Sequence, residues 1–186
     1  MKKFLLFTFV LMPLCFVACS DETVIEPKQK SVVDFLELYQ KDAEYMRHAL
    51  KKYIINEDGV NDDGDNYWTI QQKNNKISPK ILYGGDEVFV SFVMKNNICV
   101  SVSLFCSDSP YAFSWSIQHI QDKYGEGNDL SAYNSNYGRD WYKWLLDDGS
   151  EISYYAFESS SIIYREKAEM EDFSIKKLEQ ITKIAN

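Results

Sequence analysis

Short strand-like segments separated by turn residues constrain the fold of this chain more than any other feature. They cover residues 67–72, 77–83, 87–94, 98–106, 141–146, 151–157 and 161–165. Most of them alternate apolar and polar side chains, which is the period of a half-buried strand. The turns between them include Lys95-Asn96-Asn97 and Asp147-Asp148-Gly149, whose Asn and Gly residues tolerate positive φ. The pattern predicts antiparallel hairpins.

Two of these segments have a predicted place in the sheet. Both faces of residues 87–94 are largely apolar, so this segment is expected to be a central strand. Pro79 has no N–H group to donate, which places residues 77–83 at an edge or requires a bulge.

Apolar residues spaced three and four apart predict three helices. The first covers residues 32–54, about six turns, and Ser31 with Asp34 can cap its start. The second covers residues 113–124 and ends at Gly125. The third, a closing helix, is indicated by Met170, Phe173, Leu178, Ile181 and Ile184. We therefore expect one α+β domain over residues 31–186. Its mainly antiparallel sheet would have about six to seven strands, with the N-terminal, middle and C-terminal helices packed on one face.

The first 18 residues have the composition of a secretory signal peptide. Lys2 and Lys3 precede the apolar residues 4–18, a stretch shorter than the roughly 20 residues that span a membrane. Residues 19–30 contain a proline and several charges without apolar periodicity, and are expected to form a flexible tether.

The residues at the end of this segment resemble the lipobox of bacterial lipoproteins: Phe16-Val17-Ala18-Cys19. The resemblance implies cleavage after Ala18 and acylation of Cys19 through its sulfur, so the protein would be anchored to a membrane by acyl chains such as palmitate. Cys15 is the rival, but it follows Leu14, which is too bulky for the small-residue position. The alternative is a plain signal peptide with an incidental cysteine.

Ser20, Asp21 and Glu22 follow the cysteine directly. They resemble the short acidic export signal of surface lipoproteins of the Bacteroidota. This resemblance implies a place in the cell envelope, at the outer membrane and exposed on its surface.

The net charge of the chain argues against nucleic acid as a partner. The chain has 28 acidic and 20 basic side chains, a net charge of -8, which is a poor match for nucleic acid.

Cys99 and Cys106 fall in one expected strand, roughly 23 Å apart and on opposite faces. A disulfide needs Cα atoms within about 7 Å, so we expect two buried thiols.

No catalytic set is recognisable in the sequence. There is no Gly-x-Ser-x-Gly motif, and the two histidines are His48, expected at the surface, and His119. Cys106, His119 and Asp122 form no spacing that demands a thiol site. We expect a non-enzymatic protein without a cofactor.

An acidic stretch at residues 57–66 contains oxygen ligands suited to calcium. Its candidates are Asp58, Asp62, Asp63 and Asp65. The order of acids before Gly64 does not follow an EF-hand loop, and such stretches are usually solvated, so no metal site is predicted.

Aromatic residues concentrate near the loop at residues 125–140. The candidate binding surface consists of Tyr133, Tyr137, Trp141, Tyr142 and Trp144. Tyrosine and tryptophan offer large, rigid contact areas to proteins or sugar rings, although most of these side chains are expected to fill the core. We expect a binding module for a macromolecular partner that uses this loop or an exposed sheet face. The alternatives are a glycan-binding surface lipoprotein and an immunity lipoprotein that neutralises a toxin.

Overall fold

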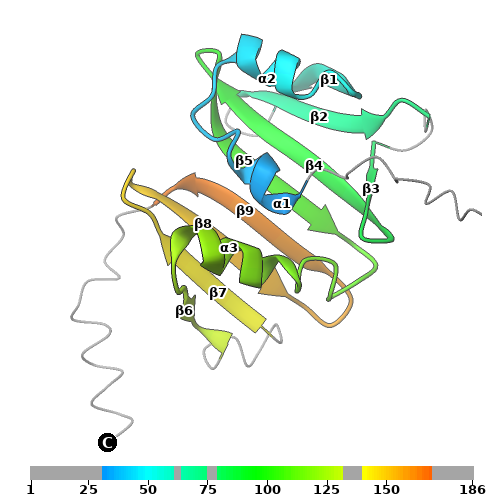
Figure 1. Ribbon diagram of the computed structural model, residues 1–186. Helices are drawn as coiled ribbons and strands as arrows, with labels where there is room; N and C mark the ends of the chain where they lie inside the picture. Colours follow the sequence, from blue (N-terminus) through cyan, green and yellow to red (C-terminus); the bar gives the residue numbers. More distant parts are fainter. Residues whose placement is uncertain (1–30, 61–63, 75–78, 132–139, 169–186) are drawn as a thin grey trace, which may run out of the picture.

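The computed structural model describes residues 31–60, 64–74, 79–131 and 140–168 (Figure 1). The expected signal peptide, lipidated cysteine and tether, and the expected closing helix, lie outside the described residues. The described chain forms one large antiparallel sheet accompanied by short helices.

Strands dominate the described residues. They are β1 (Tyr53–Val60), β2 (Asn66–Gln72), β3 (Ile81–Tyr83), β4 (Asp86–Lys95), β5 (Ile98–Cys106), β6 (Asn128–Asp129), β7 (Asp140–Leu145), β8 (Ser150–Ala156) and β9 (Ser161–Lys167). Their order in the sheet is β1-β2-β4-β5-β9-β8-β7-β6, and β3 pairs with β4 alone. The helices are α1 (Val32–Leu36), α2 (Ala43–Ala49) and α3 (Ser116–Tyr124).

The expected α+β domain, with six to seven strands and three helices packed on one face, is wrong. The sheet has nine strands, and the three helices of the described residues are short. The long N-terminal helix is replaced by α1, α2 and the start of β1. The chain leaves the helical path at Gln40, whose φ is 61°, and pairs with β5 through the Gln40 N–H and the Lys41 carbonyl, both bonded to Cys99.

Other local expectations are confirmed. Strand β4 is central, between β2 and β5, and the edge strand β3 begins shortly after Pro79. Asn96 and Asn97 form the β4–β5 turn with φ of 52° and 64°. Ser31 and Asp34 form the capping box of α1.

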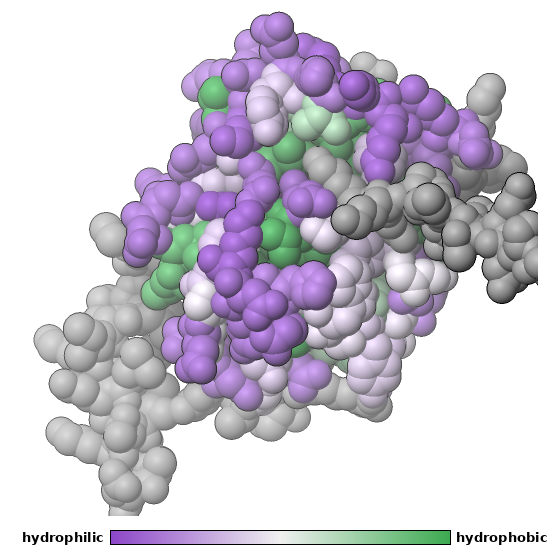
Figure 2. All heavy atoms as spheres, in the orientation of Figure 1, coloured by the Kyte–Doolittle hydropathy of each residue, from purple (hydrophilic) through white to green (hydrophobic). Residues whose placement is uncertain are grey.

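The sheet has two different faces. Helix α1 packs against α3 and β5, and Figure 1 shows both helices in front of the same side of the sheet, which we call the helix face. Core side chains on this side include Phe35, Leu36, Phe92, Leu104, Phe113, Tyr154 and Ile163. Polar side chains cover much of the molecule seen from this side, and apolar atoms show near its centre (Figure 2). We call the opposite side the open face.

Both cysteines of the described residues are buried free thiols, as expected. They do not lie on opposite faces, however, because β5 has a bulge at Val100. Met94 pairs with Cys99 and Val93 with Ser101, so Cys99 points to the helix face together with Val102 and Cys106. Burial raises the pKa of Cys99 to about 12, which keeps this thiol protonated.

Candidate functional site

The predicted aromatic surface is divided between the two faces of β7. Trp144 is 2 % exposed and belongs to the core, where Gly127 packs so closely that a Cβ would lie 2.4 Å from Cε2 of the indole. Tyr142 is on the same side and half-buried, so only Trp141 points to the open face. Tyr133 and Tyr137 lie outside the described residues.

Trp141 is the end of a row of large apolar side chains on the open face. The row crosses five strands through the cross-strand pairs Phe89–Phe105, Phe105–Ile162, Ile162–Tyr155 and Tyr155–Trp141. Phe105 is 38 % exposed, and the other four side chains are half-buried. We call these five residues the aromatic row. At about 4.8 Å between strands it is roughly 19 Å long.

The rings in and beside this row are nearly parallel. Trp141 and Tyr155 have centroids 5.3 Å apart and an interplanar angle of 20°. Tyr155 makes similar contacts with Phe157, at 6.3 Å and 11°, and with Tyr164, at 6.1 Å and 14°. Ring contacts of this kind stabilise the side chains against one another, so the row is a firm surface before any partner arrives.

A row of polar side chains lies next to the aromatic row on the open face. It consists of Ser91, Ser103, Tyr164, Ser153 and Lys143, each paired with the next across neighbouring strands. Lys143 Nζ is 2.8 Å from Glu151 Oε2, and the hydroxyls of Ser91 and Ser103 are 2.7 Å apart. Burial, with the Tyr155 side chain, raises the pKa of Tyr164 above its ordinary value, so its phenol stays neutral.

The charged and hydroxyl groups of the polar row interact with one another. Lys143 pairs with Glu151, the Ser153 hydroxyl donates to the other carboxylate oxygen of Glu151 at 3.5 Å, and the Tyr164 phenol stays neutral. The face therefore offers apolar ring surface with little net charge beside it, which suits a partner of similar character.

The other candidate residues are not brought together. His48 and His119 are exposed, and His119 lies edge-on to Trp115 rather than beside the buried Cys106. Asp65 is 3.8 Å from Lys95 Nζ, whereas Asp62, Asp63 and the side chain of Asp58 lie outside the described residues. Among the residues that are described, no group of three or more His, Cys, Asp or Glu side chains could hold a metal ion.

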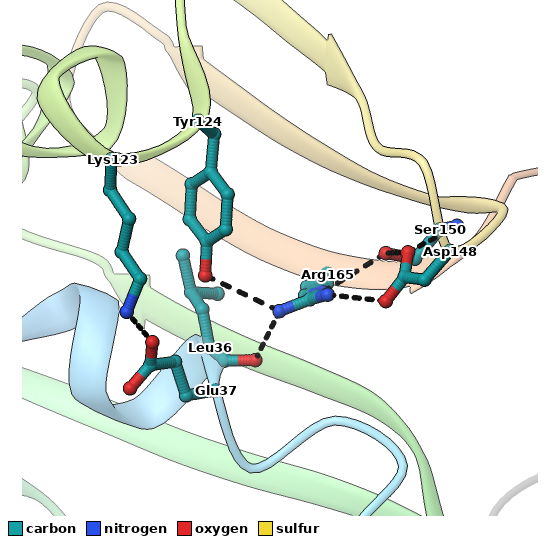
Figure 3. A network of polar contacts seen from close by, with 7 residues as sticks. All are labelled: Leu36, Glu37, Lys123, Tyr124, Asp148, Ser150 and Arg165. Carbon is teal, nitrogen blue, oxygen red and sulfur yellow. Dashed lines mark hydrogen bonds and ion pairs between the residues drawn. The ribbon is translucent and has the colours of Figure 1, made fainter.

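On the helix face, a polar network that the sequence did not indicate surrounds Arg165 (Figure 3). Its guanidinium donates to the hydroxyl of Ser150 at 3.0 Å, a carboxylate oxygen of Asp148 at 2.7 Å, the carbonyl of Leu36 at 3.4 Å and the phenol of Tyr124 at 3.4 Å. Close by, Lys123 of α3 forms an ion pair with Glu37. Arg165 thus joins β9, the β7–β8 turn, α1 and α3, and its role is structural.

Asp148 is the titratable end of this network. Burial alone would raise the pKa of its carboxyl, but hydrogen bonds from Ser150 and the charge of Arg165 outweigh that effect and lower the pKa below its ordinary value. A carboxyl whose pKa is lowered in the native state stabilises the fold at pH values above its ordinary pKa. This stabilisation is lost as the pH falls through the native pKa.

We expect Asp148→Asn to destabilise the protein at pH 7 and to have less effect in acid. Wild type loses the stabilisation due to Asp148 as the pH falls below about 4, whereas the amide does not titrate. Urea unfolding of both proteins between pH 7 and pH 2.5 measures the difference in unfolding free energy. A difference that stays constant over this range would contradict the assignment.

No helix within the described part of the chain is long and apolar enough to cross a membrane. Comparison with known proteins gives no match to any family model, curated protein or solved structure.

Proposed function

We propose that the protein is a lipid-anchored, non-enzymatic binding protein of the bacterial cell envelope that holds a macromolecular partner on its open sheet face. The observation that carries the binding role is the aromatic row, a continuous line of apolar side chains on five neighbouring strands. The lipid anchor rests on the lipobox-like residues that end at Cys19.

The row has the properties of a binding surface for three physical reasons. Aromatic side chains lose little conformational entropy on binding and bury large apolar areas. The parallel ring contacts of Trp141 and Tyr155 hold the row in place beforehand, which lowers the cost of association. The Lys143–Glu151 ion pair leaves the adjoining polar row without a strong charge that would repel either an acidic or a basic partner.

A glycan is a second candidate partner, because several aromatic side chains gather on the open face. Trp141, Phe157 and Tyr164 each lie within 5.3–6.3 Å of their shared neighbour Tyr155, ring centroid to ring centroid, and aromatic side chains of this kind contact sugar rings. The hydroxyl groups of the polar row are chemically suited to a sugar as well, although Ser153 and Ser91 are almost completely buried.

The test places a photo-crosslinking phenylalanine analogue at Phe105 and, as a matched control, at Tyr45 of α2. Both positions are exposed aromatics, at 38 % and 52 %, and Tyr45 lies off the aromatic row. In intact cells we expect irradiation to give a discrete crosslinked product from position 105 and none from position 45. Adding Phe157→Ala and Tyr155→Ala should reduce that product at least about tenfold, because these changes remove the ring of Tyr155 from the aromatic row and the neighbouring ring of Phe157.

Two results would overturn the proposal or redirect it. Equal crosslinking from positions 105 and 45 would remove the open face as the binding surface. A position-105 product that disappears when cell-surface polysaccharide is digested, and that affinity electrophoresis in polysaccharide gels reproduces, would identify the glycan as the partner.

A further inference from the structure

A short ordered loop between β5 and α3 presents two aromatic side chains to solvent. Tyr111 is 56 % exposed and Trp115 is 44 % exposed, whereas Ala112 and Phe113 between them are buried. The N–H and the hydroxyl of Ser114 both donate to the Tyr111 carbonyl, at 3.1 and 2.9 Å. This helix-like turn places residues four apart on the same side, so the two aromatic rings face outward together.

The loop is held firmly from below. The hydroxyl of Ser161 donates to the carbonyl of Ser109 at 2.8 Å, and the Tyr154 phenol donates to the carbonyl of Pro110 at 3.3 Å. Phe113 packs in the core against Tyr83, with ring centroids 5.7 Å apart. The outward position of Tyr111 and Trp115 is therefore built into the fold.

The same loop lies next to the start of the described chain. Trp115 stacks on Tyr83, with centroids 5.2 Å apart and an interplanar angle of 13°. The Tyr83 phenol bonds to the Ser116 hydroxyl at 2.9 Å and also to the backbone of Val32, the first residue of α1. The chain that comes from Cys19 therefore reaches the domain beside Trp115.

We propose that Tyr111 and Trp115 rest in the headgroup region of the membrane to which Cys19 is attached. This inference rests on the acylation of Cys19 in the proposed function. Residues 20–30 connect the cysteine to Ser31, a reach of at most about 40 Å when fully extended and about 20 Å as a random coil. Tyrosine and tryptophan favour the membrane–water interface because one end of each ring system is apolar and the other is polar.

The charge around the loop is partly neutralised. The ammonium of Lys80 lies 3.7 Å from a carboxylate oxygen of Glu87 and 3.8 Å from one of Asp108, so this group of three keeps a net negative charge. The contact therefore suits a zwitterionic phosphatidylcholine surface better than an anionic one.

The test measures quenching of tryptophan fluorescence by brominated lipids. The full acylated protein is reconstituted into phosphatidylcholine vesicles with plain or brominated acyl chains. The emission of Trp115 is obtained by subtracting the tryptophan emission of Trp115→Phe from that of wild type. The phenylalanine keeps an aromatic ring stacked on Tyr83. We expect brominated chains to lower this emission at least about twofold, because the bromine atoms lie close to an interfacial indole.

Trp141 on the open face supplies the matched control. The difference between wild type and Trp141→Phe should be the same in both kinds of vesicle. Tyr111→Trp in the Trp115→Phe background provides a second reporter. The tryptophan at position 111 should again show emission that is lower in brominated than in plain vesicles.

Vesicle flotation separates the two ways in which the experiment can fail. Protein that does not float with the vesicles lacks the anchor, and the proposed function then fails. Protein that floats, but whose emission from positions 115 and 111 is equal in plain and brominated vesicles, overturns the membrane contact of this loop and leaves the anchor in place.

Discussion

Cys19→Ser is expected to abolish the incorporation of labelled palmitate into the protein completely. A serine lacks the sulfur through which the lipobox cysteine of bacterial lipoproteins is acylated. Buried methylene groups contribute about 0.8 kcal/mol each, and one chain alone anchors only marginally, so the loss of all acyl chains removes the stable attachment. The measurement is metabolic labelling of cells, followed by purification of the protein and mass analysis of its N-terminal peptide.

Cys15→Ser is the matched control, four residues earlier in the same apolar segment. It should leave palmitate incorporation and the mature N-terminus unchanged. Palmitate incorporation by the Cys19→Ser protein at the wild-type level would contradict the lipid anchor at Cys19. A wild-type mature N-terminus other than Cys19 would contradict it as well, and the proposed place in the cell envelope depends on this anchor.

Arg165→Met is expected to lower the free energy of unfolding by about 2–4 kcal/mol. The methionine fills much of the volume of Arg165 but removes the guanidinium donors from the Leu36 carbonyl, the Ser150 hydroxyl and the Asp148 carboxylate. The estimate stays below the largest losses seen for buried ion pairs because the Asp148 side chain is 40 % exposed and water can replace part of the interaction.

Lys167→Met on the same strand controls for the loss of a positive charge from β9. Lys167 is exposed, and its replacement should change the free energy of unfolding by no more than about 0.5 kcal/mol. Urea unfolding followed by circular dichroism measures both variants. If they unfold at the same urea concentration, the Arg165 network does not hold the helices to the sheet.

Local signals in the sequence were sufficient for much of the sheet. Asn96 and Asn97 tolerate the positive φ of the β4–β5 turn, and the largely apolar β4 is a strand with neighbours on both of its edges. The prediction of one long N-terminal helix was wrong for a reason that the spacing of apolar residues cannot reveal. Two short helices with a break at Gln40 bury the same apolar positions as one long helix, and the break is made by pairing with the distant Cys99.

The candidate site was only partly predictable, because it depends on register between distant strands. Trp141 was identified from the sequence, but Trp144 is a core residue on the other face of β7. Phe89, Phe105 and Ile162 join Trp141 only through the pairing of β9 with β5 and β8, which no local pattern specifies. The alternation of apolar and polar residues in these segments predicted strands with two different faces. It did not predict which strands lie next to one another.

The position of β9 has a consequence for how the protein is made. It is the last strand of the described chain, yet it lies between β5 and β8 and joins everything before it into one sheet. Until residues 161–167 have emerged during synthesis or export, β5 and β8 each have an unpaired edge that can associate with other chains. Shielding of these edges by chaperones should therefore matter most just before residues 161–167 become available for pairing.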